Sequence, residues 1–200
     1  MADFNTYYPK LVKHEGGYVN DSLDRGGETY RGISRKNFPK WNGWLVLDNI
    51  QPIKKNTVFA GLENTVRGFY KNTFWNTIKA DQIKNQSVAE ILVDWKINGG
   101  FNPKKIQQMV GEKQDGAIGD RTIQAINKAD STHLFATIKQ ARKAHYTAII
   151  KNNPSQAKFA NGWFARIESF QYTPTVAIGL GAIVMIGWIL YLISDSKSLV

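Results

Sequence analysis

The sequence predicts a mainly α protein: a helical domain with a small N-terminal β element and one C-terminal transmembrane helix. Three observations support this fold class. Apolar residues recur at helical spacing through most of residues 57–170. Four glycines lie between Glu15 and Thr29, where they favour tight turns over regular structure. A stretch without charged residues then runs from Thr173 to Ile193.

The N-terminal elements are short. A helix is predicted over residues 5–14, because its apolar side chains share one face and a pair of glycines ends it. Residues 18–20 and 29–34 have the pattern of short extended segments around glycine-rich turns. Residues 41–52 carry two tryptophans but no clear period, and we interpret them as a loop with a helical turn.

Helices fill the rest of the predicted domain. Residues 57–75 carry one apolar stripe, which predicts a helix. Ser87-Val-Ala-Glu90 has the pattern of a capping box, which predicts that the next helix begins at Ser87. The remaining predicted helices are one opened by Asn102-Pro103, one capped by Asp120, a long one over residues 131–152 and a short one over residues 161–170.

Composition limits the classes of function. A chain of 200 residues has room for one domain or two small ones. The absence of cysteine excludes a disulfide framework and thiolate chemistry, and three scattered histidines indicate neither a metal site nor a cofactor. The formal net charge of +10 favours an anionic partner. Because the positive charges are scattered and no binding motif accompanies them, we expect no specific nucleic-acid partner.

The C-terminal stretch predicts a membrane anchor over residues 173–194. About 20 residues at 1.5 Å each span a hydrocarbon core of roughly 30 Å. Trp188 and Tyr191 lie toward one end of the stretch, as interfacial aromatic residues often do. The N-terminal residues 1–8 are polar and lack the apolar core of a signal peptide. We therefore expect a single-pass C-terminal helix in a lipid bilayer.

The chemistry of the N-terminal region centres on a glutamate. Glu15 lies at the end of the first predicted helix, where the partial negative charge of the helix raises the pKa of a carboxyl group. A carboxylic acid that stays protonated near neutral pH can protonate a glycosidic oxygen. Asp24 could remain ionised and stabilise a positively charged sugar, and Thr29 could hold a water. The ordinary alternative is an exposed glutamate, a turn-forming aspartate and a strand threonine.

The same region carries a family resemblance. Three motifs together resemble the signature of glycoside hydrolase family 108, the lysozyme-like N-acetylmuramidases of phages and bacteria: His14-Glu-Gly-Gly-Tyr-Val-Asn-Asp21, Asp24-Arg-Gly-Gly-Glu-Thr29 and Arg31-Gly-Ile-Ser34. The order is also similar to the Glu, Asp and Thr triad of phage-type lysozymes, but one residue shorter before the threonine. The resemblance implies an α+β lysozyme-like fold with Glu15, Asp24 and Thr29 as catalytic residues.

The resemblance continues downstream. Residues 68–75 resemble the Tyr/Trp helix of the family, and residues 93–100, 115–122 and 161–166 resemble the predicted peptidoglycan-binding region that accompanies it. It implies a catalytic region over residues 1–85 and a helical region over residues 86–170 that completes the fold and lines the glycan cleft. The residues expected to contact the substrate are Tyr18, Tyr30, Trp75 and Asn98.

We therefore expect a membrane-anchored peptidoglycan hydrolase that cleaves the β-1,4 bond between N-acetylmuramic acid and N-acetylglucosamine. Its partners would be glycan strands and the bilayer, and its setting phage lysis or entry, at a virion membrane or the host inner membrane. Two alternatives stay open. A lytic transglycosylase needs one carboxylic acid and no water-activating partner, and an inactive wall-binding or structural protein needs neither.

Overall fold

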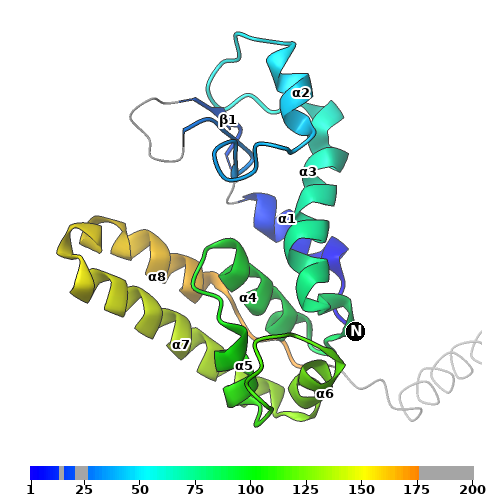
Figure 1. Ribbon diagram of the computed structural model, residues 1–200, viewed down its shortest axis with the longest axis vertical. Helices are drawn as coiled ribbons and strands as arrows, with labels where there is room; N and C mark the ends of the chain where they lie inside the picture. The colour runs from blue at the N-terminus through cyan, green and yellow to red at the C-terminus, as the bar shows by residue number, and fades with distance from the viewer. Residues whose placement is uncertain (14–15, 21–26, 176–200) are drawn as a thin grey trace, which may run out of the picture.

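The computed structural model describes residues 1–13, 16–20 and 27–175 and confirms a mainly helical fold with a small sheet. Figure 1 shows the sheet and α2 on one side of the molecule and α4 to α8 on the other, with α1 between them. We call residues 16–20 and 27–62 the sheet lobe, and residues 80–175 the helical lobe. One continuous cluster of buried apolar residues extends from Ala2 to Ala141, so the two lobes share a core.

Helix α1 (Phe4–Lys13) joins the lobes. Its buried side chains recur at intervals of three and four residues, so they form one face of the helix: Phe4, Tyr7, Tyr8 and Leu11. This face packs against Trp75, whose ring stacks on Tyr7 at a centroid distance of 5.9 Å. The position of α1 matters for function, because the predicted catalytic segment follows its last residue, Lys13, directly in the sequence.

The sheet is an antiparallel meander of three two-residue strands, β1 (Tyr18–Val19), β2 (Thr29–Tyr30) and β3 (Ile33–Ser34). Tyr30 lies opposite Tyr18 on one side and Ile33 on the other. The turn between β2 and β3 consists of Arg31 and Gly32, with φ of 49° and 74°. Positive φ at both positions suits the right-handed twist of a tight hairpin.

Gly17 shows why glycines gather before β1. A Cβ atom at this position would lie 2.4 Å from the backbone carbon of Asn56. The backbone of Asn56 and Thr57 lies this close because it is hydrogen-bonded to β1. Tyr18 N donates to Thr57 O at 2.9 Å, and Asn56 N donates to Tyr18 O at 2.7 Å. Gly17 is therefore required because another backbone segment of the same chain lies against it.

The middle of the chain changes helix type along its length. Residues 41–52 contain the short helix α2 (Gly43–Asp48). The stripe over residues 57–75 predicted one helix, but the structure divides it into η1 (Ala60–Leu62), α3 (Glu63–Tyr70) and the π-helical turn η2 (Lys71–Trp75). Two short turns follow, η3 (Asn76–Ile78) and η4 (Ala80–Gln82).

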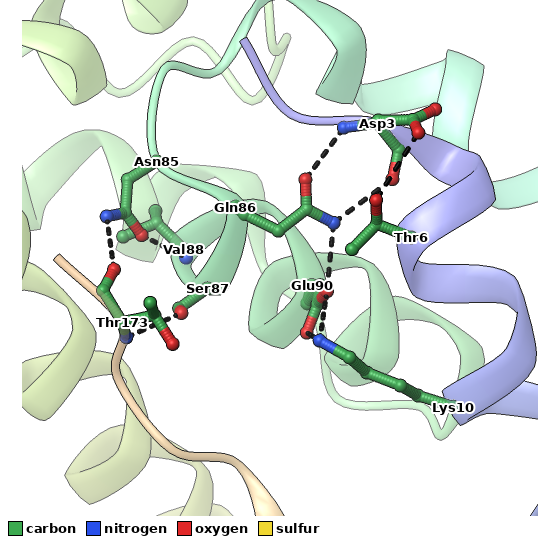
Figure 2. Close-up of polar contacts among 9 residues, drawn as sticks. All are labelled: Asp3, Thr6, Lys10, Asn85, Gln86, Ser87, Val88, Glu90 and Thr173. Carbon is green, nitrogen blue, oxygen red and sulfur yellow. Dashed lines mark hydrogen bonds and ion pairs between the residues drawn. The ribbon is translucent and has the colours of Figure 1, made fainter. Parts of the chain in front are cut away.

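Helix α4 (Gln86–Ile97) begins earlier than the capping-box pattern predicted. Its N-cap is Asn85, whose Oδ1 accepts a hydrogen bond from Val88 N at 3.0 Å (Figure 2). Ser87 instead accepts from the backbone of Thr173, and the Glu90 carboxylate binds Lys10 Nζ at 2.7 Å. The prediction was wrong because both polar side chains of the pattern have partners in other parts of the fold.

The helical lobe continues with α5 (Pro103–Met109), α6 (Asp120–Lys128), the long α7 (Ser131–Asn152), η5 (Pro154–Phe159) and α8 (Ala160–Ser169). Asn102 caps α5 as predicted, accepting from Lys104 N at 3.0 Å. Asp120 does not cap α6: it is the first helical residue, and its carboxylate pairs with Lys79.

Residues 170–175, which we call the strap, lie on the helical lobe. The Tyr172 hydroxyl is 2.7 Å from Ser131 Oγ. Thr173 N donates to Ser87 Oγ at 2.9 Å, and Thr173 O accepts from Asn85 Nδ2 at 3.0 Å (Figure 2). The predicted anchor therefore cannot begin at Thr173, because Thr173 is bound to the start of α4.

Residues 176–194 of the predicted anchor lie outside the described residues. Over the ranges that the structure does describe, no helix combines the length and apolar character needed to cross a membrane.

Candidate active site

Of the three predicted catalytic residues, the structure describes only Thr29. Glu15 and Asp24 lie outside the described residues. Thr29 lies in β2, opposite Val19 on one side and Ser34 on the other. Thr29 is half-buried, and its hydroxyl makes no hydrogen bond to a described residue.

Next to Thr29, the carboxylate of Glu28 fixes the base of the β1–β2 connection. Glu28 Oε1 accepts a hydrogen bond from the Tyr18 hydroxyl at 2.9 Å, and Oε2 pairs with Arg35. Burial raises the pKa of the Tyr18 phenol, which therefore stays protonated and donates. Arg35 also pairs with Asp48 and lies 4.4 Å above the ring of Trp44. We call Tyr18, Glu28, Arg35 and Asp48 the Glu28 network.

Sequence analysis assigned no role to Glu28, although a signal was present. Glu28 and Tyr30 lie two residues apart along an extended segment, so both side chains point to the same face. Because Tyr30 is buried, a carboxylate on that face needs a partner. Tyr18, predicted to contact the substrate, contributes its hydroxyl to this network. The same hydroxyl accepts a hydrogen bond from Gln51 Nε2 at 3.1 Å.

Tyr30 and Trp75, also predicted to contact the substrate, lie in the core. The Tyr30 ring stacks on Trp41 and Phe59, and its hydroxyl accepts from Phe59 N at 2.8 Å. Trp75 is 0% exposed, and its indole N–H donates to Asp81 Oδ1 at 2.6 Å. Neither ring offers an exposed face to a sugar.

Asn98 ends α4. Its Nδ2 donates to the carbonyl oxygen of Asp94 at 2.8 Å, which closes the last turn of the helix. Gly99 and Gly100 follow with φ of 79° and 83°, and a Cβ at Gly100 would lie 2.3 Å from His145 Nε2. Burial lowers the pKa of His145, so this histidine is neutral at pH 7. The two glycines let the chain turn against α7.

A buried ion network lies deeper in the helical lobe. Asp94 of α4 accepts from Arg142 Nη2 of α7 at 2.6 Å and from Arg166 Nη2 of α8 at 2.8 Å. Arg166 Nε also donates to Asp94, at 3.0 Å. One carboxylate thus faces two guanidinium groups. We call these three residues the Asp94 network.

The Asp94 network forms part of the wall of a cavity of about 430 Å³, which we call the α1 pocket. Its lining comes from α1, α4, α8 and the strap, and its charged members are Lys10, Lys13, Glu90, Asp94 and Arg166. Lys13 is the last residue of α1, and Glu15 follows two positions later in the sequence. The described residues therefore place a pocket lined by both basic and acidic side chains beside the start of the predicted catalytic segment.

Tyr7 lines the same pocket from α1. Burial raises the pKa of its phenol well above the usual value, and the nearby charge of Asp94 raises it further. Its hydroxyl is buried without a hydrogen-bond partner among the described residues. Across those residues, no group of three or more His, Cys, Asp or Glu side chains is arranged to hold a metal ion.

Comparison with known proteins identifies two segments. Residues 8–100 match the family model described as glycosyl hydrolase 108, and residues 103–168 match the one described as predicted peptidoglycan domain. The matches meet between α4 and α5, whereas the sequence analysis divided the chain before α4. Among solved structures, the chain is similar to the one titled "Structure of Brucella abortus SagA". The two share 25% identity, 84% of this chain and 90% of that chain are covered, and the TM-score is 0.61. No curated protein matches the chain.

Proposed function

We propose that the protein cleaves the β-1,4 bond between N-acetylmuramic acid and N-acetylglucosamine, because residues 8–100 match the glycosyl hydrolase 108 model and residues 103–168 the predicted peptidoglycan domain. The two matches support a glycosidase with peptidoglycan as its partner. The choice of bond is the proposal, and the observation that carries it is the family match across the segment from Glu15 to Thr29.

In the proposed reaction, Glu15 protonates the glycosidic oxygen of the leaving sugar. Asp24 remains ionised and stabilises the positive charge that develops on the sugar ring as the bond breaks. Thr29 holds the attacking water. The Thr29 hydroxyl, which makes no hydrogen bond to a described residue, supports its part, and the Glu28 network next to it holds β2 in place. Tyr18 acts by positioning Glu28, and Asn98 by ending α4.

The α1 pocket supports the assignment of the site. Its described lining includes Lys13 at the end of α1, and Asp94 holds Arg166 through two hydrogen bonds. Peptidoglycan carries carboxylates on its lactyl and peptide groups, which a lysine such as Lys13 attracts.

The test is the variant Glu15→Gln, which is nearly isosteric but cannot donate a proton. Loss of a general acid typically lowers the rate by about 10²- to 10⁴-fold, and we expect a loss of that order in reducing sugars released from purified peptidoglycan. Glu168→Gln is the matched control, because it makes the same change on the exposed face of α8. Near-normal release by folded Glu15→Gln protein would overturn the assignment.

The products separate hydrolysis from the alternative reaction. A lytic transglycosylase forms 1,6-anhydro ends and needs no water, whereas the proposed hydrolase leaves reducing ends. Mass spectrometry of the digested glycan distinguishes the two. We expect reducing ends from the native chain, and we expect Thr29→Val to slow their formation by removing the hydroxyl that holds the water.

We also propose that residues 176–193 anchor the enzyme in a membrane, at a virion or in the host inner membrane, during phage lysis or entry. The support is the absence of charged residues over residues 173–193. We expect the full chain to resist alkaline carbonate extraction, and a chain that stops after Thr175 to be released. Full-length protein that stays soluble without detergent would contradict the anchor.

A further inference from the structure

A second cavity, of about 590 Å³, lies where the sheet lobe meets α3 and η2, between residues 37–42 and that helical segment. It shares no lining residue with the α1 pocket. We propose that this cavity, the sheet-lobe pocket, binds an N-acetylated hexosamine unit of the peptidoglycan strand at a distance from the bond being cleaved. The proposal rests on the proposed function, because it takes the same polymer as its ligand.

The apolar side of the pocket is built from interlocked rings. Phe38 meets Phe69 edge-on at a centroid distance of 4.8 Å, and Trp41 meets Phe69 at 6.3 Å. Trp41 is held in turn by Trp44, whose ring is nearly perpendicular at 5.0 Å. Phe38 and Phe69 are only partly buried, so part of their ring surface faces the cavity. Such rings suit the C–H face of a pyranose, which is apolar while its rim is polar.

The polar side carries neutral groups that are not used elsewhere. Asn37, Asn42 and Thr65 line the pocket, and their side chains donate no hydrogen bond to a described residue. An amide can both donate and accept, as the hydroxyl and acetamido groups of a hexosamine require. Among the described residues of the lining, Lys40 alone is charged and none carries a carboxylate. Lys40 would therefore attract a lactyl carboxylate on the sugar, and no carboxylate of the described lining would repel it.

The backbone keeps the pocket open. Gly68 lies on its wall, in α3, and a Cβ there would have no heavy atom within 4 Å. A glycine inside a helix costs about 1 kcal/mol relative to alanine, and packing does not require it here. Two residues later α3 gives way to the π-helical turn η2, which contributes Asn72 to the lining. Single π-helical turns occur frequently at functional sites.

The character of the lining favours a sugar over a protein partner. A protein interface has a broad apolar centre, whereas this cavity combines three rings with several neutral polar side chains in a hollow of the size that small ligands occupy. A lipid chain would leave the amides without partners, and burying such groups unpaired is costly.

The test fills the pocket from its open wall. Gly68→Leu places a side chain in empty space, and Gly162→Leu makes the same change in α8, where a Cβ also meets nothing within 4 Å. Full-length protein in detergent, carrying Glu15→Gln so that the sugar is not consumed, is titrated with a tetrasaccharide of alternating N-acetylglucosamine and N-acetylmuramic acid. NMR follows the side-chain amide signals of Asn37 and Asn42.

We expect these amide signals to shift on titration, and Gly68→Leu to weaken the binding that they report by about tenfold or more, with Gly162→Leu unchanged. Shifts that survive Gly68→Leu unaltered, or amides that never respond, would overturn the proposal. Should Gly68→Leu fail to fold, Thr65→Val removes one polar contact at constant shape and should weaken binding severalfold.

A second readout separates this proposal from the proposed function. With an active Glu15, Gly68→Leu should raise the KM for whole sacculi severalfold, whereas Gly162→Leu should leave KM and kcat unchanged. If the native chain cleaves no glycan at all while the amides still respond to sugar, the proposed function fails and the sheet-lobe pocket stands. If cleavage is normal and KM does not depend on Gly68, the pocket proposal fails alone.

Discussion

The two lobes each hold a carboxylate against arginine, but at different depths. In the sheet lobe, the Glu28 side chain is 15% exposed and its partner Arg35 is 31% exposed. In the helical lobe, Asp94 and Arg142 are 2% and 1% exposed. Water screens the first pair and is excluded from the second. Loss of one partner therefore has a different cost in the two pairs. In the buried pair the remaining charge is left without water or a counter-ion, whereas in the partly exposed pair water can solvate it.

The largest effect is expected for Asp94→Asn, which leaves Arg142 and Arg166 without their shared anion. Removal of one partner from a buried ion network typically costs about 3–5 kcal/mol, and we expect a loss of this size in the free energy of unfolding. Urea denaturation at pH 7 measures it. The double variant Asp94→Leu and Arg142→Met is the control, since replacing buried charges by apolar groups should restore part of the loss.

The strap comes next, because it extends the helical lobe beyond the segment that matches the peptidoglycan domain. A chain that stops after Ser169 loses the hydrogen bonds of Tyr172 and Thr173 to Ser131, Asn85 and Ser87. At about 1 kcal/mol for each bond, we expect a loss of about 2–3 kcal/mol relative to a chain that stops after Thr175. Thermal unfolding of the two truncated chains compares them, and equal stability would mean that the strap only rests on the surface.

A smaller loss is expected for Glu28→Gln. The hydrogen bond from Tyr18 can persist, whereas the ion pair with Arg35 is lost at a half-exposed site, so we expect a cost of about 1 kcal/mol. The matched comparison is Asp94→Asn under identical urea conditions. A Glu28 variant as unstable as the Asp94 variant would show that depth does not govern the two networks.

The smallest effect is expected at the exposed carboxylate of Glu168. Hydrogen bonds from Lys143 and Lys139 lower its pKa to about 2. Because the folded pKa lies below the unfolded value of about 4.3, any stability that Glu168 contributes is present above pH ~4.3 and is lost as pH falls toward 2. NMR titration of the carboxyl should show the low pKa, and Glu168→Gln should unfold nearly like the native chain at pH 6.

Local patterns predicted the elements that local chemistry determines. The range of α7, Ser131–Asn152, was predicted fully, because a polar cap precedes it, a proline follows it and its apolar residues keep one period. The start of α4 was missed because Ser87 and Glu90 bind Thr173 and Lys10, residues distant in the sequence. Tyr30 and Trp75 could not be distinguished from sugar platforms, since an aromatic residue has the same pattern in a core and in a binding site.

The candidate site shows the same division. The glycine-rich motif indicated where to look, because its residues are consecutive. The Asp94 network could not be predicted from spacing, since its hydrogen bonds join residues 48 and 72 positions apart. A buried aspartate on a helix with apolar residues around it was the available signal, and it indicates that a partner must exist without naming it.

The strap also sets a mechanical property of the molecule. A force that pulls on Thr175 reaches Thr173 first, and both backbone groups of Thr173 are bonded to the start of α4, through Ser87 and Asn85 (Figure 2). The load therefore enters the core at α4 before it can reach the end of α8. Tethering the chain by its C-terminal side would leave α8, and the arginine it supplies to the α1 pocket, free of tension.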